Sequence, residues 1–219
     1  MLPGILDFFI HIDKALPTVS EQYGLLTYLI LFTIILLETG VIITPFLPGD
    51  SLLFVSGMIA AEGSLDIQLL WVVFITAAIC GGVLNYWTGR HLGLRVLLQH
   101  FPSIVRKEHV TRAYEYLARY GGKTIFFARF IPLLRTFTPF LAGVVAMDYR
   151  RFTLYNILSA LIWAILMTSA GYLLGTIPVI QDNLSFFIMV FIVITIVSVV
   201  LFIVGIIRAV FWYDKNLAA

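Results

Sequence analysis

Two stretches of the sequence place prolines, glycines and full charges inside apolar surroundings. The first is Pro45-Phe46-Leu47-Pro48-Gly49-Asp50, and the second runs from Arg129 to Gly143 as Arg-Phe-Ile-Pro-Leu-Leu-Arg-Thr-Phe-Thr-Pro-Phe-Leu-Ala-Gly. Proline interrupts a helix, and an isolated charge is unfavourable in hydrocarbon. We expect these two broken segments to face each other within a membrane and to enclose a polar site for an anionic lipid headgroup.

The composition places the whole chain in a membrane. Over 219 residues, 61% are hydrophobic and 12% are charged, and the mean hydropathy is +1.01. A soluble domain carries about 25% charged residues, so this chain has too little polar surface to face water. The composition predicts an integral membrane protein, and nucleic acid is not an expected partner.

The apolar runs predict an all-α polytopic fold that forms a single membrane domain over residues 1–219. A crossing helix needs about 20 apolar residues, and four runs meet this length: about 24–43, 67–88, 153–174 and 184–208. Two further segments, 44–61 and 124–147, are too short or too broken to cross and are predicted to be re-entrant helical hairpins. The residues expected to break these hairpins are Pro45, Pro48, Gly49, Pro132, Pro139 and Gly143.

Basic residues predict the orientation. The segment 89–123 holds seven of the fourteen Lys and Arg residues, whereas 62–66 and 175–183 hold none. Because cytoplasmic loops are enriched in Lys and Arg, segment 89–123 and both termini are expected in the cytoplasm. The first hairpin then enters from outside and the second from the cytoplasm, as in an inverted repeat. Residues 1–20 are expected to form an amphipathic interfacial helix, with a disordered leader as the alternative.

Four ionisable residues lie within the apolar segments: Glu38, Asp50, Arg129 and Arg135. Each isolated charge at the bilayer centre costs about 2.5–3.5 kcal/mol, so the two acids and two bases are expected to gather in one neutral cluster. Two guanidinium groups can hold a phosphate bidentately. A half-helix that begins at Asp50 and Ser51 would add backbone donors to the same anion.

Other roles for these four residues stay open. Buried arginine–carboxylate pairs can hold two hairpins together with no substrate involved, and Asp50 can cap a helix. Glu38 suits either ion pairing or proton coupling. In the second case Glu38, together with Asp50, would exchange a proton when an anionic headgroup competes for its arginine partner.

Weaker motifs indicate packing and anchoring. Gly171-Tyr-Leu-Leu-Gly175 is a small-xxx-small pattern that favours close helix contact. Asn85, Tyr86 and Arg90 are interpreted as interfacial anchors. No metal-ligand spacing, phosphate loop or nucleophile–base arrangement occurs, so we expect no metal, no cofactor and no enzymatic activity.

Several motifs together resemble one known family. They are Glu38-Thr-Gly, Pro45-Phe-Leu-Pro-Gly-Asp50-Ser-Leu-Leu, Asn85-Tyr86-x-x-Gly89-Arg90, Gly121-Gly-Lys-Thr and Ala128-Arg129-Phe-Ile-Pro-Leu-Leu-Arg135-Thr-Phe-x-Pro-Phe-x-Ala-Gly143. Over roughly residues 5–210, with a core at 24–175, the chain is similar to the DedA family, whose conserved core is also called the SNARE-associated or VTT domain.

The resemblance implies a bacterial inner-membrane protein with two opposed re-entrant hairpins and a role in lipid translocation. Some members return undecaprenyl phosphate to the inner leaflet, and members are linked to the proton motive force. The acids and arginines needed in relatives correspond to Glu38, Asp50, Arg129 and Arg135. Near relatives often carry an acid where this chain has Gly82. If that acid takes part in proton coupling in the relatives, this chain lacks it, so the predicted lipid site does not depend on a coupling mechanism shared with them.

The favoured hypothesis is a flippase for a phosphate-headed lipid, with undecaprenyl phosphate as the first candidate and protons as the coupling ion. A less selective phospholipid scramblase, a proton-coupled transporter of small solutes or ions, and a structural factor for other membrane machinery are the alternatives. Membrane lipids and protons are the expected partners, and assembly into a homo-oligomer stays open.

Overall fold

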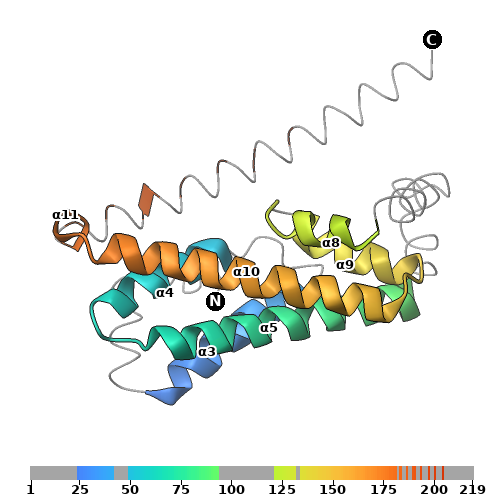
Figure 1. The fold of residues 1–219 in the computed structure, drawn as a ribbon, viewed down its shortest axis with the longest axis horizontal. Helices are drawn as coiled ribbons and strands as arrows, with labels where there is room; N and C mark the ends of the chain where they lie inside the picture. Colours follow the sequence, from blue (N-terminus) through green and yellow to red (C-terminus); the bar gives the residue numbers. More distant parts are fainter. Residues whose placement is uncertain are drawn as a thin grey trace, which may run out of the picture.

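The computed structural model describes residues 24–41, 49–93, 121–131 and 134–181, together with isolated positions between 183 and 204. Every regular element in these ranges is helical (Figure 1), which confirms the all-α prediction. The elements are α3 (Leu25–Gly40), α4 (Gly49–Ala61), α5 (Ile67–Thr88), the π-helical turn η1 (Gly89–Gly93), α8 (Gly122–Ala128), α9 (Leu134–Val144), α10 (Tyr149–Gly175) and α11 (Pro178–Gln181).

Two helices are long and apolar enough to cross a membrane. They cover Ile67–His91, which is 25 residues, and Tyr149–Gly175, which is 27 residues. At 1.5 Å per residue each is roughly 38 Å long, enough for a hydrocarbon core of about 30 Å. They run antiparallel along the long axis of the molecule (Figure 1) and confirm the spans predicted at 67–88 and 153–174.

The other two predicted spans differ in outcome. The first, expected at 24–43, is a helix of only 16 residues, α3, which is shorter than a full crossing. The run 184–208 lies largely outside the described residues, as do the predicted interfacial helix at 1–20 and residues 94–120 of the basic segment.

Aspartates fix where both long helices begin. Asp66 precedes α5 and accepts hydrogen bonds from the backbone N–H groups of Gln68 and Leu69. Asp148 precedes α10 and accepts one from Arg151. Each carboxylate satisfies donors that have no partner within the first turn of the helix.

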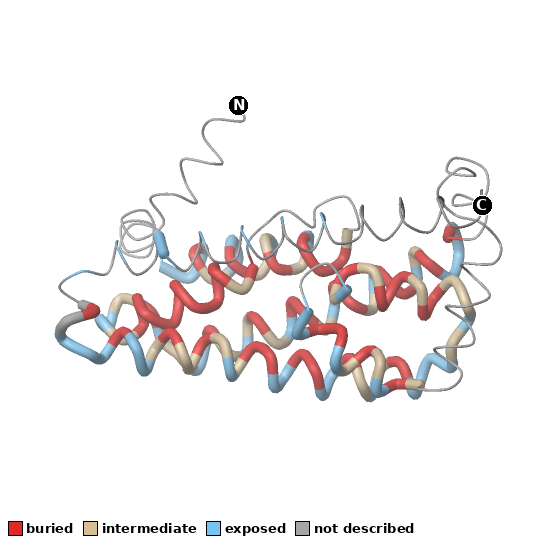
Figure 2. Tube along the Cα trace, turned by 90° about the horizontal axis from the view of Figure 1, so that it is seen from above, coloured by how far each residue is buried: buried red, intermediate tan, exposed pale blue. Residues whose placement is uncertain are grey.

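The core lies around α4, which is buried at almost every position. A helix that is apolar on all sides belongs inside a protein, and α4 packs most extensively against α10. Large apolar side chains on α3, α5 and α10 face outwards instead, among them Leu25, Val72 and Leu173. Buried and exposed positions alternate along the two long helices (Figure 2), as expected when lipid surrounds the outer faces.

Glycines set the crossing of α4 with α10. A side-chain carbon at Gly57 would collide with the backbone carbonyl of Thr168, and one at Gly171 would collide with that of Phe54. Gly175 likewise lies against Met58. Because no Cβ atom separates the two backbones, the helices touch directly, as the Gly171–Gly175 pattern predicts.

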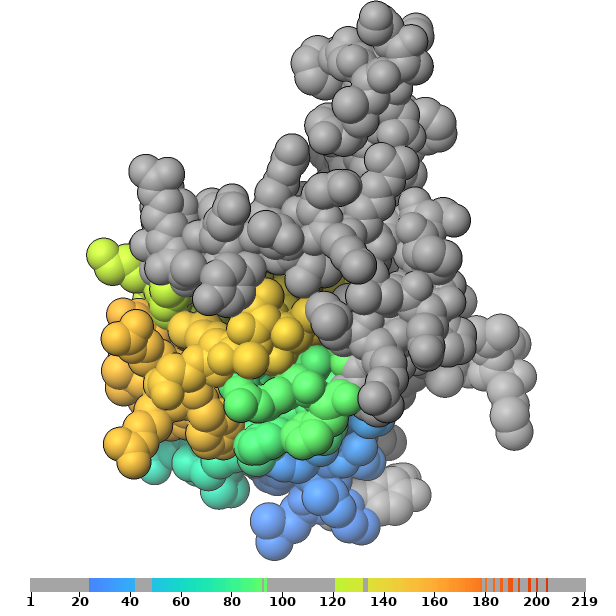
Figure 3. All heavy atoms as spheres, turned by 90° about the vertical axis from the view of Figure 1, so that its right-hand side faces the viewer, coloured from blue at the N-terminus to red at the C-terminus, as the bar shows by residue number. Residues whose placement is uncertain are grey.

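The crossing of α9 with the end of α5 repeats this arrangement. A side-chain carbon at Gly143 would collide with the carbonyl of Tyr86, and one at Gly89 with the carbonyl of Phe140. Seen end-on, α9 and the start of α10 lie against this end of α5 (Figure 3). In both crossings the paired contacts are three residues apart on each helix, so the two share one register.

The half-length helices α4 and α9 run in opposite directions from the middle of the molecule. Helix α4 ends beside Gly175 at the end of α10, whereas α9 ends beside Gly93 in η1. The second broken segment has the expected helix–break–helix form, since α8 ends at Ala128 and α9 begins at Leu134. The leaflet from which each segment enters stays a prediction.

The residues that were expected to break the helices divide into three groups. Gly49 begins α4, as predicted. The prediction for Pro139 is wrong because this proline lies inside α9. A proline leaves the carbonyl four residues before it, here that of Arg135, without its helical hydrogen bond. Asn85 donates to the next carbonyl, that of Thr136. The prediction for Gly143 is wrong as well, because this glycine lies inside α9, where it is a packing contact. Pro45, Pro48 and Pro132 lie outside the described residues.

We predict that Gly57→Ala destabilises the protein by about 1–3 kcal/mol, because the new methyl group must push α4 away from the backbone of α10. Thermal unfolding in detergent, followed by circular dichroism, measures the change. Gly40→Ala is the milder comparison, because its methyl group would lie 3.1 Å from the flexible end of Leu84 and 3.3 Å from the backbone of Gly81, without the direct collision found at Gly57. Equal losses in the two variants would contradict the proposed close crossing.

Candidate functional site

Arg135 binds two carboxylates at the centre of the bundle. Its Nη1 lies 2.6 Å from Asp50 Oδ1, and its Nη2 donates to Glu38 Oε1. The Glu38 side chain is fully buried, that of Arg135 is 9% exposed and that of Asp50 is 18% exposed. The structure therefore brings together three of the four charged residues that the sequence singled out, and the cluster is most open at Asp50.

Glu38 also joins the end of α3 to the start of α4. Its Oε1 accepts a hydrogen bond of 3.1 Å from the backbone N–H of Gly49. A carboxylate at this place satisfies a free donor and faces the positive end of the α4 dipole. A side chain at Gly49 would collide with the Glu38 carboxylate, so the close approach requires glycine.

Trp163 of α10 contacts both Asp50 and Arg135. Its Nε1–H donates to Asp50 Oδ1 at 2.8 Å, and the Arg135 guanidinium carbon lies 5.4 Å from the centre of its ring. The distance suits a cation–π interaction. Trp163 is buried, so these contacts form in an environment that strengthens them.

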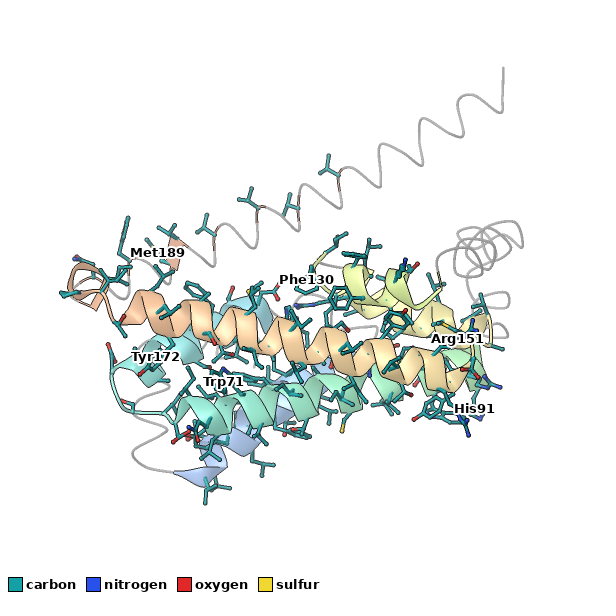
Figure 4. The ribbon with its side chains drawn as sticks, in the orientation of Figure 1. Trp71, His91, Phe130, Arg151, Tyr172 and Met189 are labelled. Carbon is teal, nitrogen blue, oxygen red and sulfur yellow. The ribbon has the colours of Figure 1, made fainter. Side chains whose placement is uncertain are left out.

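Arg129 lies apart from the two carboxylates. It follows α8 and is 6% exposed; its neighbour Phe130 lies over the middle of α10 (Figure 4). Its Nη2 donates to Asn156 Oδ1 at 2.6 Å and to the Ala78 carbonyl at 3.4 Å. Within the part of the chain that the structure describes, Arg129 forms no ion pair and its Nη1 has no hydrogen-bond partner.

Asn85 of α5 links α3 with α9. Its Nδ2 donates to the carbonyl of Thr39 at 3.1 Å and to that of Thr136 at 2.6 Å. The interpretation of Asn85 as an interfacial anchor is wrong, because its side chain is completely buried. Anchoring fits the exposed Arg90 and His91 better, and Figure 4 shows His91 and Arg151 at the same end of the molecule.

Ser51, the remaining predicted contact, is buried in the first turn of α4 next to Asp50. The sequence reasoning missed Asn156 and Trp163. Both are polar-tipped side chains on one face of α10, separated by seven residues or about 10 Å along the axis. An amide within an apolar span is itself a signal that could have identified Asn156.

The arrangement suits an anion. The N-termini of α4 and α9 both lie at the Arg135 cluster, because Gly49 contacts Glu38 and Arg135 lies in the first turn of α9. Helix N-termini and guanidinium groups both favour negative charge. The Arg135 cluster thus combines one guanidinium group, two helix ends and two carboxylates that an incoming anion can replace, and Arg129 lies apart from it.

We predict that Arg135→Gln destabilises the protein by about 3–5 kcal/mol, because it leaves two buried carboxylates side by side without a cation. Glu38→Gln should cost less, since Arg135 keeps its ion pair with Asp50. Thermal unfolding of the purified variants measures both effects. Arg151→Gln, at an exposed position of α10, serves as the control and should leave the unfolding midpoint unchanged.

The comparisons of this chain with known proteins agree on one family. Residues 47–173 match the model of the VTT domain. Protein DedA of Escherichia coli K12 is 44% identical over 194 residues, which is 88% of this chain and 89% of that protein. The inner membrane protein YqjA of the same organism is 34% identical over 69% of each chain. An uncharacterized membrane protein of Mycobacterium leprae is 36% identical over 69% of this chain and 68% of its own length.

No solved structure matches the chain. The domain match covers more than half of the sequence, and the relatives align over most of their length. The apolar helices and the composition agree with both findings. The chain is therefore a membrane protein of the DedA family, built on a VTT domain.

Proposed function

We propose that this protein moves a phosphate-headed lipid between the leaflets of the bacterial inner membrane, with undecaprenyl phosphate as the first candidate. The observation that carries the proposal is the buried cluster of Glu38, Asp50 and Arg135, with Arg129 nearby, where two opposed half-length helices begin. The name of the relative YqjA, an inner membrane protein, supports this location.

The energetics favour a substrate over a purely structural cluster. A single buried ion pair would be enough to join two helices, and replacing such a pair by apolar residues is often neutral or stabilising. This chain instead buries a second arginine with an unsatisfied nitrogen. An unsatisfied charged group is unfavourable, so its retention is better explained by a ligand that binds it part of the time.

The proposed transfer needs to shield only the headgroup. The hydrocarbon tail can remain in the surrounding lipid, because the phosphate charge presents the main barrier. Arg135 would exchange its carboxylate partners for phosphate oxygens, starting with the more exposed Asp50. A carboxylate released in this way can take up a proton, which would couple lipid movement to the proton gradient through Glu38 and Asp50.

Reconstitution into liposomes tests this function. We expect purified protein to transfer undecaprenyl phosphate between leaflets, and Arg129→Gln and Arg135→Gln to abolish the transfer, while Arg151→Gln serves as the matched control. Transfer is measured by the access of a membrane-impermeant phosphatase to the lipid. Equal movement of phosphatidylethanolamine would support the phospholipid scramblase. Solute uptake without lipid movement would support the solute transporter, and no transport at all would contradict the proposal.

We predict that Glu38→Gln abolishes the pH dependence of lipid transfer, because the amide cannot accept or release a proton. The measurement compares initial transfer rates across a pH series for the variant and the wild type. Trp163→Phe is the control, since it removes one hydrogen bond to Asp50 but leaves both carboxylates in place. An unchanged pH profile in the Glu38→Gln protein would contradict proton coupling at this residue.

A further inference from the structure

The partner of Arg129 is unusual for a buried arginine. A guanidinium removed from water commonly pairs with a carboxylate, and Arg135 pairs with two. Arg129 is bonded instead to the neutral amide oxygen of Asn156 and to a backbone carbonyl. Both partners accept hydrogen bonds, but neither cancels the charge.

We propose that Asn156 is a positioning residue that orients Arg129 and keeps its charge available for the phosphate of the headgroup. This inference rests on the proposed function and divides the site into two parts. With its residues ionised, the Arg135 cluster carries two negative charges and one positive charge. Among the described residues no carboxylate compensates the positive charge of Arg129, so an arriving phosphate is attracted first to Arg129 rather than to Arg135.

The orientation of the Asn156 amide is fixed on its other side. Its Nδ2 donates to the Ile79 carbonyl at 3.1 Å, which directs Oδ1 towards Arg129. Gly82 makes room for this amide, since a side-chain carbon there would collide with Asn156 Oδ1 and lie 2.9 Å from Nδ2. The Asn156 carboxamide is therefore held between α5 and Arg129, and it leaves Nη1 of the guanidinium unused.

The nearly isosteric change Asn156→Asp separates this role from a structural one. It places a carboxylate against Arg129 and neutralises it. If Arg129 only holds the fold together, the new ion pair should be harmless. If Arg129 binds phosphate, the carboxylate competes with the ligand, and we expect affinity to fall by about 30-fold or more.

The test uses the full-length protein in detergent with farnesyl phosphate as the probe, and with farnesol and inorganic phosphate for comparison. Binding is measured from the ligand-dependent shift of the unfolding midpoint. The control Asn156→Leu removes the hydrogen bonds to Arg129 and to the Ile79 carbonyl without adding charge, and it should weaken binding by about two- to fivefold. In an Arg129→Gln background, Asn156→Asp should have no further effect on binding.

Three outcomes would overturn the inference alone: wild-type affinity in Asn156→Asp, equal losses in the Asp and Leu variants, or an undiminished effect of Asn156→Asp without Arg129. Inorganic phosphate binding as tightly as farnesyl phosphate would overturn the assignment to a lipid. Failure of the wild type to bind farnesyl phosphate would overturn the proposed function as well. If Asn156→Asp does not fold, the double variant Gly82→Asp/Asn156→Ala brings a carboxylate towards Arg129 from α5 and should weaken binding equally.

Discussion

The fold depends on the ion pairs that Arg135 makes with Glu38 and Asp50. These residues come from three helices, and Trp163 adds contacts from a fourth. Charges inside a membrane protein are unfavourable unless an opposite charge or a polar group lies against them. The chain must therefore bring distant segments to one point, and this requirement explains why α3 ends, and α4 and α9 begin, at the Arg135 cluster partway along the molecule.

Ending helices in the interior creates a second requirement, because helix ends carry unsatisfied backbone groups. The structure meets it with buried side chains: the Glu38 carboxylate accepts from Gly49, and the Asn85 amide donates to carbonyls of α3 and α9. The glycine crossings then hold α4 and α9 directly against the two long helices. Hydrogen bonds to the buried polar groups and close helix packing together stabilise a charged site within an apolar protein.

The features of the fold that were predicted best from the sequence are those that depend on a local pattern of residues. The bounds of α5 agree with the apolar run 67–88, and the start of α4 at Gly49 follows from the Pro-Gly pair. The sequence overestimated α3, which ends at Gly40 because the Glu38 carboxylate must reach Gly49. Pro139 was misjudged because the sequence does not show that Asn85, which lies 51 residues before Thr136, donates to the Thr136 carbonyl, beside the carbonyl that the proline leaves unbonded. The roles of Asn156 and Trp163 could not be predicted, since they depend on which face of α10 meets Arg129 and Arg135.

The shared register of the two glycine crossings relates the two halves of the chain, α3–α5 and α8–α10, to each other. Phe54 and Gly57 meet Thr168 and Gly171 as Phe140 and Gly143 meet Tyr86 and Gly89. Each half thus presents a surface complementary to a half like itself, pointing the other way. A half-turn that exchanges α4 with α9 and α5 with α10 would therefore bring one glycine crossing onto the other.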